Sequence, residues 1–474
     1  MPEHKNSAMG ENVMGRVNHI HFVGIGGAGM SGIAEVLHNL GYQISGSDLC
    51  ETSVIKHLCS LGINIELNHD PAQINGCDVV VYSSAITNEN SELIAARAKR
   101  IPVIPRAEML AELMRLQQGI AVAGTHGKTT TTSLVASVLA EGGFDPTYVI
   151  GGLLNSSGSH ARLGTGKYLV AEADESDASF LHLQPTIAIL TNVDADHLET
   201  YGGDINCLQE NFIEFLHHLP FNGLAVICLD DEGVRKIMGN ILKPFKTYGF
   251  DTGADYFAHD VRHEGQQSWF QVSRADHKAW LNVKLNLPGK HNILNALAAI
   301  TVAHEVGVAD ESIITALAEF QGIGRRCQVL GELDIQGKKV LVIDDYAHHP
   351  REINATLQAV REGWPDKRVV VIFQPHRYTR TRDLFEDFCQ VLSETDKLLL
   401  LEIYSAGEKS IIGADGRSLC RAIRRRGQVD PIFVEQRDEL SPLLENLIEE
   451  NDLLLVLGAG DVGSISASLV QQYG

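Results

Sequence analysis

A short glycine turn that contains a lysine constrains the fold of this chain more than any other stretch. The apolar residues 121–123 run into Gly124-Thr-His-Gly-Lys128, and four threonines follow at 129–132. This order is typical of a buried strand that ends in a phosphate-binding loop and continues into a helix. Val122 stands where the first glycine of the general G-x-x-x-x-G-K-[ST] pattern belongs, so the loop is a shortened form of that pattern.

The loop predicts a nucleotide site. Backbone N–H groups and Lys128 can surround phosphate oxygens, while the hydroxyl of Thr129 can hold Mg²⁺. We expect the nucleotide to be bound by the residues of the loop and of the helix start, which are Gly124, Thr125, His126, Gly127, Lys128, Thr129 and Thr130.

Length and charge narrow the class of protein. A chain of 474 residues is long enough for roughly three domains of about 150 residues each. The chain has 39 basic and 60 acidic residues, and the resulting net charge of −21 argues against a nucleic-acid partner. Arg421 and Arg424–Arg426 form the one basic cluster, and their helical spacing predicts a solvated helix face.

The cysteines and the apolar runs indicate the compartment. Eight cysteines are scattered without a C-x-x-C pair, which favours reduced thiols over disulfides or a zinc site. Residues 1–7 are polar, so we do not expect a signal peptide there. No apolar run approaches the roughly 20 residues of a membrane helix. We therefore expect a soluble cytoplasmic protein with no membrane partner.

The first segment, residues 1–117, has the order of a Rossmann-type half. A strand at 19–23 precedes Gly24-Ile-Gly26-Gly-Ala-Gly29, a helix at 30–39, a strand at 42–45 and Asp48. This pattern predicts pyrophosphate binding, with a tight turn that holds no ligand as the alternative. It does not specify the ligand: NAD is the usual one, and a UDP group presents the same diphosphate. Ser83 and Ser84 follow a strand at 78–82, at the sheet edge where such folds bind ligands.

The second segment, residues 118–322, contains candidate metal ligands at two strand ends. An apolar strand at 168–171 runs into Glu172-Ala-Asp-Glu-Ser-Asp177, and Glu172 is favoured because a carboxylate inside an apolar run needs a compensating partner. A strand at 186–190 leads to Asp196 and His197. A neutral imidazole binds divalent metals, and Asp196 could take part or orient it. The alternatives are an acidic surface loop and an ordinary loop histidine.

A polar run opens the last helices of this segment. His291, Asn292 and Asn295 precede a helix expected at 296–305, and residues 321–324 are expected to be a linker. The asparagines could cap the helix, or together with His291 they could hydrogen-bond an adenine edge.

The third segment, residues 323–474, predicts another parallel α/β sheet. Its apolar runs lie at 339–343, 368–373, 397–402 and 452–457. Arg377 and Arg380 follow the second run at a spacing that suits a carboxylate or phosphate. Gly458-Ala-Gly460-Asp-Val-Gly463 repeats the G-x-G-x-x-G pattern, but no acid-ended second strand follows. We therefore expect a close strand–helix turn there rather than a dinucleotide site.

As a set these motifs closely resemble the Mur ligase family, which comprises ATP-dependent amide ligases of peptidoglycan precursor synthesis. The resemblance covers essentially the whole chain. It is carried by seven stretches, at residues 21–32, 124–131, 172–177, 196–197, 288–292, 344–350 and 374–380.

The resemblance implies three α/β domains and a reaction. Residues 1–117 would bind a UDP-sugar, residues 118–322 would bind ATP, and residues 323–474 would form a Rossmann-like amino-acid domain. The implied reaction joins L-alanine to the lactyl carboxylate of UDP-N-acetylmuramate through an acyl phosphate, with release of ADP and phosphate. The first glycine motif then binds UDP. Implied sugar-nucleotide contacts are Gly24, Gly26, Gly27, Ala28, Gly29, Met30, Ser31, Asp48, Ser83, Ser84 and Arg106.

The resemblance also implies roles for the remaining polar residues. Lys128 would contact the terminal phosphates, and Thr129, Glu172 and His197 would serve Mg²⁺. Implied nucleotide contacts are His291, Asn292 and Asn295 at the adenine, with Arg326 and Asp345 from the third segment; implied alanine contacts are Tyr346, His348, His376, Arg377 and Arg380. Either His348 or His376 could act as the base. We expect a monomer or a weak homodimer.

One departure and three alternatives accompany this interpretation. Sibling ligases hold a second Mg²⁺ with a carbamylated lysine soon after the Asp-His pair, whereas no lysine occurs here between His197 and Pro220. The ligands of a second metal are therefore undefined. The alternatives are a nicotinamide-dependent oxidoreductase, a nucleotide-binding switch, and a relative that ligates another amino acid or a peptide to the same sugar.

Overall fold

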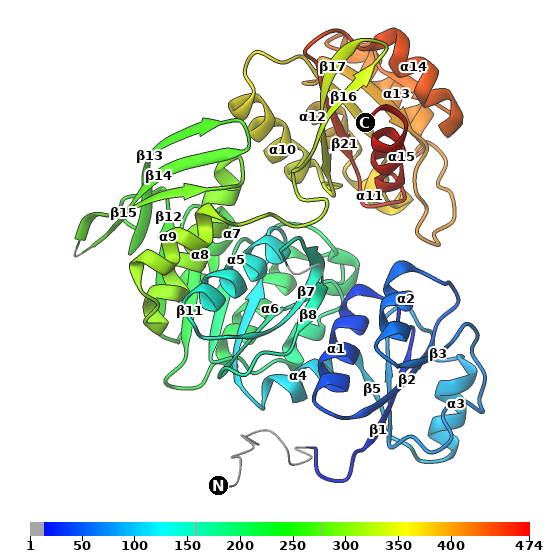
Figure 1. Ribbon diagram of the computed structural model, residues 1–474, viewed down its shortest axis with the longest axis vertical. Helices are drawn as coiled ribbons and strands as arrows, with labels where there is room; N and C mark the ends of the chain where they lie inside the picture. The colour runs from blue at the N-terminus through cyan, green and yellow to red at the C-terminus, as the bar shows by residue number, and fades with distance from the viewer. Residues whose placement is uncertain (1–13, 157–158, 276) are drawn as a thin grey trace, which may run out of the picture. The chain divides into compact units, whose positions relative to one another are not determined.

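Three β-sheets organise the part of the chain that the computed structural model describes, residues 14–156, 159–275 and 277–474 (Figure 1). The polar segment at residues 1–7 lies outside it. By internal contacts the chain divides into two compact units. The first runs up to His259 and adds Gln271–Asn282 and Leu294–Leu317; the second comprises Asp260–Phe270, Val283–Ile293 and Ala318–Gly474.

The N-terminal sheet has the strand order β3-β2-β1-β4-β5, and all its pairs are parallel. Its elements are β1 His19–Val23, α1 Ala28–Asn39, β2 Gln43–Ser47, α2 Ser53–Ser60, β3 Asn64–Glu66, β4 Val79–Tyr82, α3 Ser91–Ala98, β5 Val103–Pro105 and α4 Arg106–Met114. Ile20 and Phe22 of β1 share a buried cluster with Ile33 and Leu37 of α1. This packing holds the glycine loop between β1 and α1 at the carboxyl edge of the sheet.

The central sheet has the order β15-β14-β13-β12-β11-β10-β6-β9-β7-β8. Its elements are β6 Gln118–Ala123, α5 Lys128–Glu141, β7 Thr147–Leu154, β8 Ser159–Arg162, β9 Tyr168–Glu172, η1 Ser179–His182, β10 Ile187–Leu190, η2 Leu198–Tyr201, α6 Ile205–His217, β11 Leu224–Cys228, α7 Glu232–Met238, β12 Phe245–Gly249, β13 Tyr256–Glu264, β14 Gln267–Arg274, β15 His277–Leu285, α8 Lys290–Val306 and α9 Asp310–Ala318.

Strand β6 lies between β10 and β9, parallel to both. The phosphate loop that follows β6 is therefore flanked by the carboxyl ends of β9 and β10, which carry Glu172 and Thr191. This is the edge where open α/β sheets bind ligands.

Two features of this part differ from the prediction. Seven of its strands were not predicted, namely β7, β8, β11, β12, β13, β14 and β15. Helix α8 begins at Lys290, whereas it was expected to begin at Ala296. Asn292 and Asn295 therefore lie inside its first turns, so the interpretation of these asparagines as caps ahead of the helix is wrong.

The C-terminal sheet has the order β16-β17-β21-β18-β19-β20. Its elements are β16 Gln328–Ile335, β17 Lys338–Asp345, α10 Pro350–Gly363, β18 Val369–Phe373, α11 Tyr378–Asp383, α12 Phe385–Leu392, β19 Lys397–Leu401, α13 Gly416–Arg426, β20 Ile432–Val434, η3 Arg437–Glu439, α14 Leu440–Leu447, β21 Leu453–Leu457 and α15 Gly463–Tyr473.

The predicted parallel sheet is present, but its edge strand β16 is antiparallel to β17. The two are joined by Gln336 and Gly337, whose φ angles are 53° and 82°. Two consecutive positive φ angles are the signature of a type I′ turn, which suits a two-residue hairpin. The four predicted strands, β17, β18, β19 and β21, are parallel to one another as expected, whereas the antiparallel strand β16 was not predicted.

The remaining expectations concern the surface and the thiols. Arg424 and Arg426 are exposed on α13 and pair with Asp430 and Glu386 at 2.6 and 2.8 Å, as expected for a solvated helix face. All eight cysteines are free. No helix in the described ranges is long and apolar enough to cross a membrane.

Candidate functional site

The phosphate loop depends on two glycines. Gly124 has φ 126° and Gly127 has φ 81°, and α5 begins directly after Gly127. A Cβ atom on Gly124 would lie 2.1 Å from Thr191 Oγ1, which leaves no room for a larger residue. The backbone N–H groups at the start of α5 therefore lie next to the loop, in the arrangement that binds phosphates.

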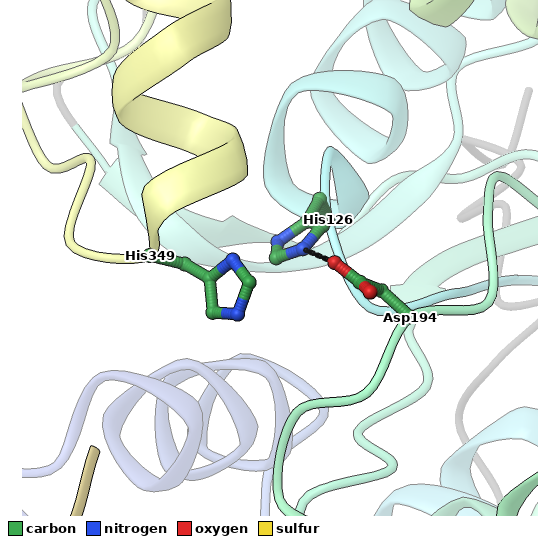
Figure 2. Close-up of side chains that lie close together, drawn as sticks. All are labelled: His126, Asp194 and His349. Carbon is green, nitrogen blue, oxygen red and sulfur yellow. Dashed lines mark hydrogen bonds and ion pairs between the residues drawn. The ribbon is translucent and has the colours of Figure 1, made fainter. Parts of the chain in front are cut away.

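Residues after β10 brace the loop. Thr191 Oγ1 donates to His126 O at 2.7 Å, and Asn192 both accepts from His126 N–H at 2.8 Å and donates to His126 O at 2.9 Å. Asp194 N–H donates to Thr125 Oγ1 at 2.9 Å, and the Asp194 carboxylate lies 3.1 Å from His126 Nε2 (Figure 2). Because Asn192 already binds the His126 N–H, a phosphate contact from that group stays a prediction.

Lys128 is held inside the loop. Its ammonium donates to Gly124 O at 2.7 Å, to Thr125 O at 3.1 Å and to Glu175 at 2.9 Å. Glu175 is 1% exposed, and burial raises its pKa to about 7 although Lys128 opposes this rise. Burial would lower the pKa of Lys128, but Glu175 and Asp174 outweigh it and raise that pKa, so the ammonium stays charged.

Two of the three predicted metal ligands are in contact. Thr129 Oγ1 donates to Glu172 Oε2 at 3.2 Å, while Gly151 N–H donates to Glu172 Oε1 at 2.6 Å. His197 lies in the loop after β10 with φ 54°. Its N–H donates to Asp196 Oδ1 at 2.9 Å, and its Nε2 lies 3.6 Å from Asp196 Oδ2. Asp196 therefore has the geometry of the orienting partner.

The glycine loop after β1 and the phosphate loop line one pocket of about 300 Å³. Arg106 packs against the glycine loop, because a Cβ on Gly29 would lie 2.6 Å from Arg106 Nη1, and it pairs with Asp174 at 3.2 Å. Burial would raise the pKa of Asp174, but Lys128 and Arg106 hold it below its ordinary value. The predicted site residues that line this pocket are Gly27, Gly29, Met30, Ser83, Ser84, Arg106, Lys128 and Glu172.

Other predicted contacts of the first segment are held by their own chain. The Asp48 carboxylate accepts from Gly26 N–H at 2.8 Å and from Leu49 N–H at 2.7 Å. A ribose contact for Asp48 stays a prediction. Ser31 is buried in α1, and Ala28 is outside the residues whose side chains are described.

Helix α8 meets the phosphate loop at Asn295. Its Oδ1 accepts from Thr131 Oγ1 at 3.1 Å and would lie 2.7 Å from a Cβ on Gly127. Asn292 donates from Nδ2 to Pro288 O at 2.8 Å. Desolvation lowers the pKa of His291 to about 4, so this ring is neutral.

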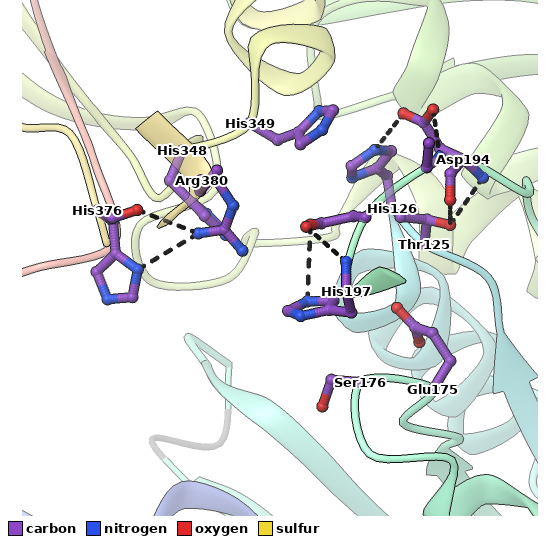
Figure 3. Close-up of polar contacts among 12 residues, drawn as sticks. Thr125, His126, Glu175, Ser176, Asp194, His197, His348, His349, His376 and Arg380 are labelled. Carbon is purple, nitrogen blue, oxygen red and sulfur yellow. Dashed lines mark hydrogen bonds and ion pairs between the residues drawn. The ribbon is translucent and has the colours of Figure 1, made fainter. Parts of the chain in front are cut away.

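In the second unit, the predicted side chains of Tyr346, His348, His376 and Arg380 form a cluster. The ring centroids of Tyr346 and His348 lie 5.5 Å apart, those of His348 and His376 lie 5.8 Å apart, and Tyr404 stacks on His376 at 5.5 Å. Arg380 Nη1 lies 3.4 Å from both His376 Nδ1 and His376 O (Figure 3). Burial, followed by the charges of His348 and the arginines, lowers the pKa of His376 to about 3.

The predicted nucleotide contacts of this unit lie at the end of β17. Asp345 accepts from Cys327 N–H at 2.8 Å and from Ala347 N–H at 2.7 Å. Burial raises the pKa of Asp345 to about 6, and Arg326 opposes this rise. The Arg326 guanidinium lies 5.1 Å from the Tyr346 ring centroid.

Three family models match the chain in succession. The Mur ligase family catalytic domain matches residues 19–118, the Mur ligase middle domain matches 122–303, and the glutamate ligase domain of Mur ligases matches 325–460. The chain belongs to the Mur ligase family. The resemblance inferred from the motifs is thereby confirmed.

Individual Mur ligases agree over nearly the full length. The chain is 58% identical over 460 residues to a UDP-N-acetylmuramate–L-alanine ligase of Halorhodospira halophila, covering 97% of this chain and 94% of that one. The crystal structure of a UDP-N-acetylmuramate–alanine ligase from Thermotoga maritima is 32% identical with a TM-score of 0.81, covering 96% and 98% of the two chains. A murein peptide ligase from Psychrobacter arcticus is 25% identical with a TM-score of 0.69 and the same coverage. The predicted three-domain α/β fold is confirmed.

Three residues of the two units were missed in the sequence. Glu175 lies in the acidic run after Glu172, Asp194 lies just before the Asp196-His197 pair, and Tyr404 follows β19. The strand-end rule that identified His376 would also have identified Tyr404. The burial of Glu175 beside Lys128 has no signature in the sequence.

Substituting Gly124 tests the braced loop. We expect Gly124→Ala to abolish binding of a fluorescent ATP analogue and to lower the free energy of unfolding by about 3 kcal/mol or more, because backbone strain adds to the clash with Thr191. Gly143→Ala is the matched control, since its φ is 77° but nothing lies within 4 Å of the added Cβ. It should cost only about 1–2 kcal/mol and leave binding intact. Equal effects from the two substitutions would contradict the bracing.

The titration of His376 tests the alanine-side cluster. A histidine ring ordinarily protonates near pH 6.5, but with a pKa of about 3 His376 should stay neutral from pH 8 down to pH 5. Nitrogen-15 NMR of histidine-labelled protein, with the signal assigned by its loss in His376→Asn, would measure this. A midpoint between pH 6 and 7 would show that the ring is not desolvated.

Proposed function

We propose that this chain is an ATP-dependent ligase that joins L-alanine to UDP-N-acetylmuramate in the cytoplasm. The products would be UDP-N-acetylmuramoyl-L-alanine, ADP and phosphate. The name and 58% identity of the Halorhodospira halophila relative support the substrates. The observation that carries the proposal is the pocket in which a Rossmann-type glycine loop and Lys128 of a phosphate loop meet.

Each of the three predicted segments would bind one of the substrates. Residues 1–117 would bind the UDP-sugar, with the diphosphate at the glycine loop and Arg106 as its cationic partner. Residues 118–322 would bind ATP, and residues 323–474 would bind alanine. Because the first pocket joins the glycine loop to Lys128, a carboxylate extending from the sugar would lie next to the terminal phosphate of ATP.

The residues around Lys128 fit a magnesium ion. Thr129 and Glu172 present two oxygen atoms in contact with each other, and oxygen ligands are those that Mg²⁺ prefers. His197, oriented by Asp196, would complete the protein ligands. When bound, the ion would neutralise charge on the terminal phosphates of ATP.

The first chemical step joins two anions. The lactyl carboxylate attacks the γ-phosphorus of ATP, an acyl phosphate forms and ADP leaves. Lys128 and Arg326 would provide positive charge where negative charge accumulates. The three N–H donors of Lys128 are engaged by Gly124 O, Thr125 O and Glu175, so one of these bonds, such as that to Glu175, would be exchanged for the bond to phosphate.

The second step needs a neutral amine. Alanine loses a proton, its nitrogen attacks the acyl carbonyl, and phosphate leaves as the amide forms. With a pKa of about 3, His376 would be a poor acceptor for that proton. His348 suits the role better, because its Nδ1 lies 3.0 Å from Tyr346 O and 3.3 Å from Glu352, which favours the tautomer with Nε2 as acceptor. Arg377 and Arg380 would bind the alanine carboxylate.

Phosphate release tests the whole proposal. We expect release only when UDP-N-acetylmuramate, ATP, Mg²⁺ and L-alanine are all present, in a screen across the amino acids and a muramyl tripeptide. Release without the sugar would indicate a nucleotide switch. Activity with another amino acid or with the peptide, in place of alanine, would identify a different ligase.

Lys128→Ala separates the two substrate sites. We expect turnover to fall by at least about 1,000-fold, since Lys128 neutralises phosphate charge in the transition state. Binding of UDP-N-acetylmuramate, measured by calorimetry, should change less than about threefold. Lys236→Ala is the control, because Lys236 forms an exposed ion pair with Glu232, at 2.9 Å. If sugar binding also collapsed in Lys128→Ala, the assignment of the two segments would be wrong.

A further inference from the structure

The second G-x-G-x-x-G turn is filled by a side chain of the same unit. It follows β21, and α15 begins at its last glycine, Gly463. Arg325 Nη2 donates to Gly458 O at 2.6 Å, and Arg325 Nη1 lies 3.4 Å from Gly460 O. A Cβ on Gly463 would lie 2.6 Å from the Arg325 guanidinium carbon. These glycines therefore make room for an arginine.

The same guanidinium has two further partners. Arg325 Nε lies 3.2 Å from Asp344 Oδ2, and Asp344 is only 4% exposed. The guanidinium also lies 5.2 Å from the Tyr346 ring centroid. A planar group that bonds two carbonyls and a carboxylate while it lies over an aromatic ring is held in one orientation.

The backbone around Arg325 needs such an anchor. Arg325 has φ 59° and Cys327 has φ 46°, and residues with a side chain rarely adopt this conformation. Tyr346 N–H donates to Arg325 O at 2.7 Å, and Cys327 N–H donates to Asp345 Oδ2 at 2.8 Å. The chain is thus fixed on both sides of Arg326, and Arg326 points over the same Tyr346 ring at 5.1 Å.

We propose that Arg325 is a positioning residue for Arg326, and that the second glycine turn is the socket that receives it. The inference rests on the proposed function, in which Arg326 contacts the nucleotide. Asp344 and Asp345 are adjacent at the end of β17 and hold different groups. Asp344 binds the Arg325 side chain, and Asp345 binds the backbone N–H of Cys327.

Two substitutions displace Arg325 in different ways. Arg325→Ala removes the guanidinium, and Gly463→Ala expels it by steric conflict while leaving it in the chain. Each should lower turnover at saturating ATP about 10- to 100-fold, as expected when a catalytic group is misplaced by about 1 Å. The KM for alanine and the binding of UDP-N-acetylmuramate should stay within about threefold. Arg361→Ala, which removes a surface pair with Asp396 in the same unit, is the matched control and should have no effect.

A double-mutant cycle distinguishes positioning from general support of the fold. In an Arg326→Lys background, in which the retained charge should leave residual turnover, both Arg325→Ala and Gly463→Ala should cause less than about twofold further loss, because the group that they position is already altered. Full additivity in the cycle would overturn the inference, and so would wild-type turnover in either single variant.

Two further measurements distinguish failure of the positioning role from misfolding of a variant and from failure of the proposed function. Arg325→Lys keeps the charge but lacks the planar guanidinium fork that reaches both carbonyls and Asp344, so it should give an intermediate loss. It serves in the cycle if Arg325→Ala fails to fold. If the unaltered chain lacks ATP-dependent ligation, the proposed function fails, and the cycle is then read from binding of an ATP analogue. Additive effects there would overturn the positioning role.

Discussion

The phosphate loop of the first unit depends on a charge that is largely removed from water, because the Lys128 side chain is only 16% exposed. Moving an ammonium group into a protein interior costs several kcal/mol unless partners replace its hydration. For Lys128 those partners are Gly124 O, Thr125 O and Glu175, all within hydrogen-bonding distance. Two of the three belong to the loop itself. The loop must therefore adopt its observed conformation for the charge of Lys128 to be stabilised. The glycine at position 124 and the bracing by Thr191 follow from this requirement.

Much of this arrangement was predictable, because it depends on local backbone requirements. A strand, a glycine turn and a helix start are contiguous in sequence, and so the phosphate loop, the first glycine loop and the position of Glu172 could be inferred directly. The Gln336-Gly337 turn carried an equally local signal for the antiparallel edge strand β16.

The rest depended on partners that are distant in sequence. Glu175 is one of several acids in a run, and only the tertiary fold places it, rather than Asp177, against Lys128. The same holds for Asp194, which meets His126 across 68 positions of the chain. The low pKa of His376 also could not be inferred, because it arises from burial and from charges on three neighbouring side chains.

The two glycine turns show what such a motif does and does not specify. Both place a strand end close to a helix start, and both bring backbone carbonyl and N–H groups to the surface of a small space. In the first turn that space opens into a pocket with Lys128, while in the second it holds the Arg325 guanidinium. The pattern thus specifies the shape of the backbone, and the surrounding residues decide whether a ligand or the protein itself occupies it.

The hydrogen bonds between the β10 loop and His126 have a consequence for affinity. A loop that acquires its shape only when a ligand arrives loses conformational entropy in the binding step and binds more weakly for that reason. Here Thr191, Asn192 and Asp194 order the loop during folding. Residues outside the proposed nucleotide contacts would thereby set how much of the binding energy is retained, so that variation in the β10 loop would change affinity without a change in those proposed contacts.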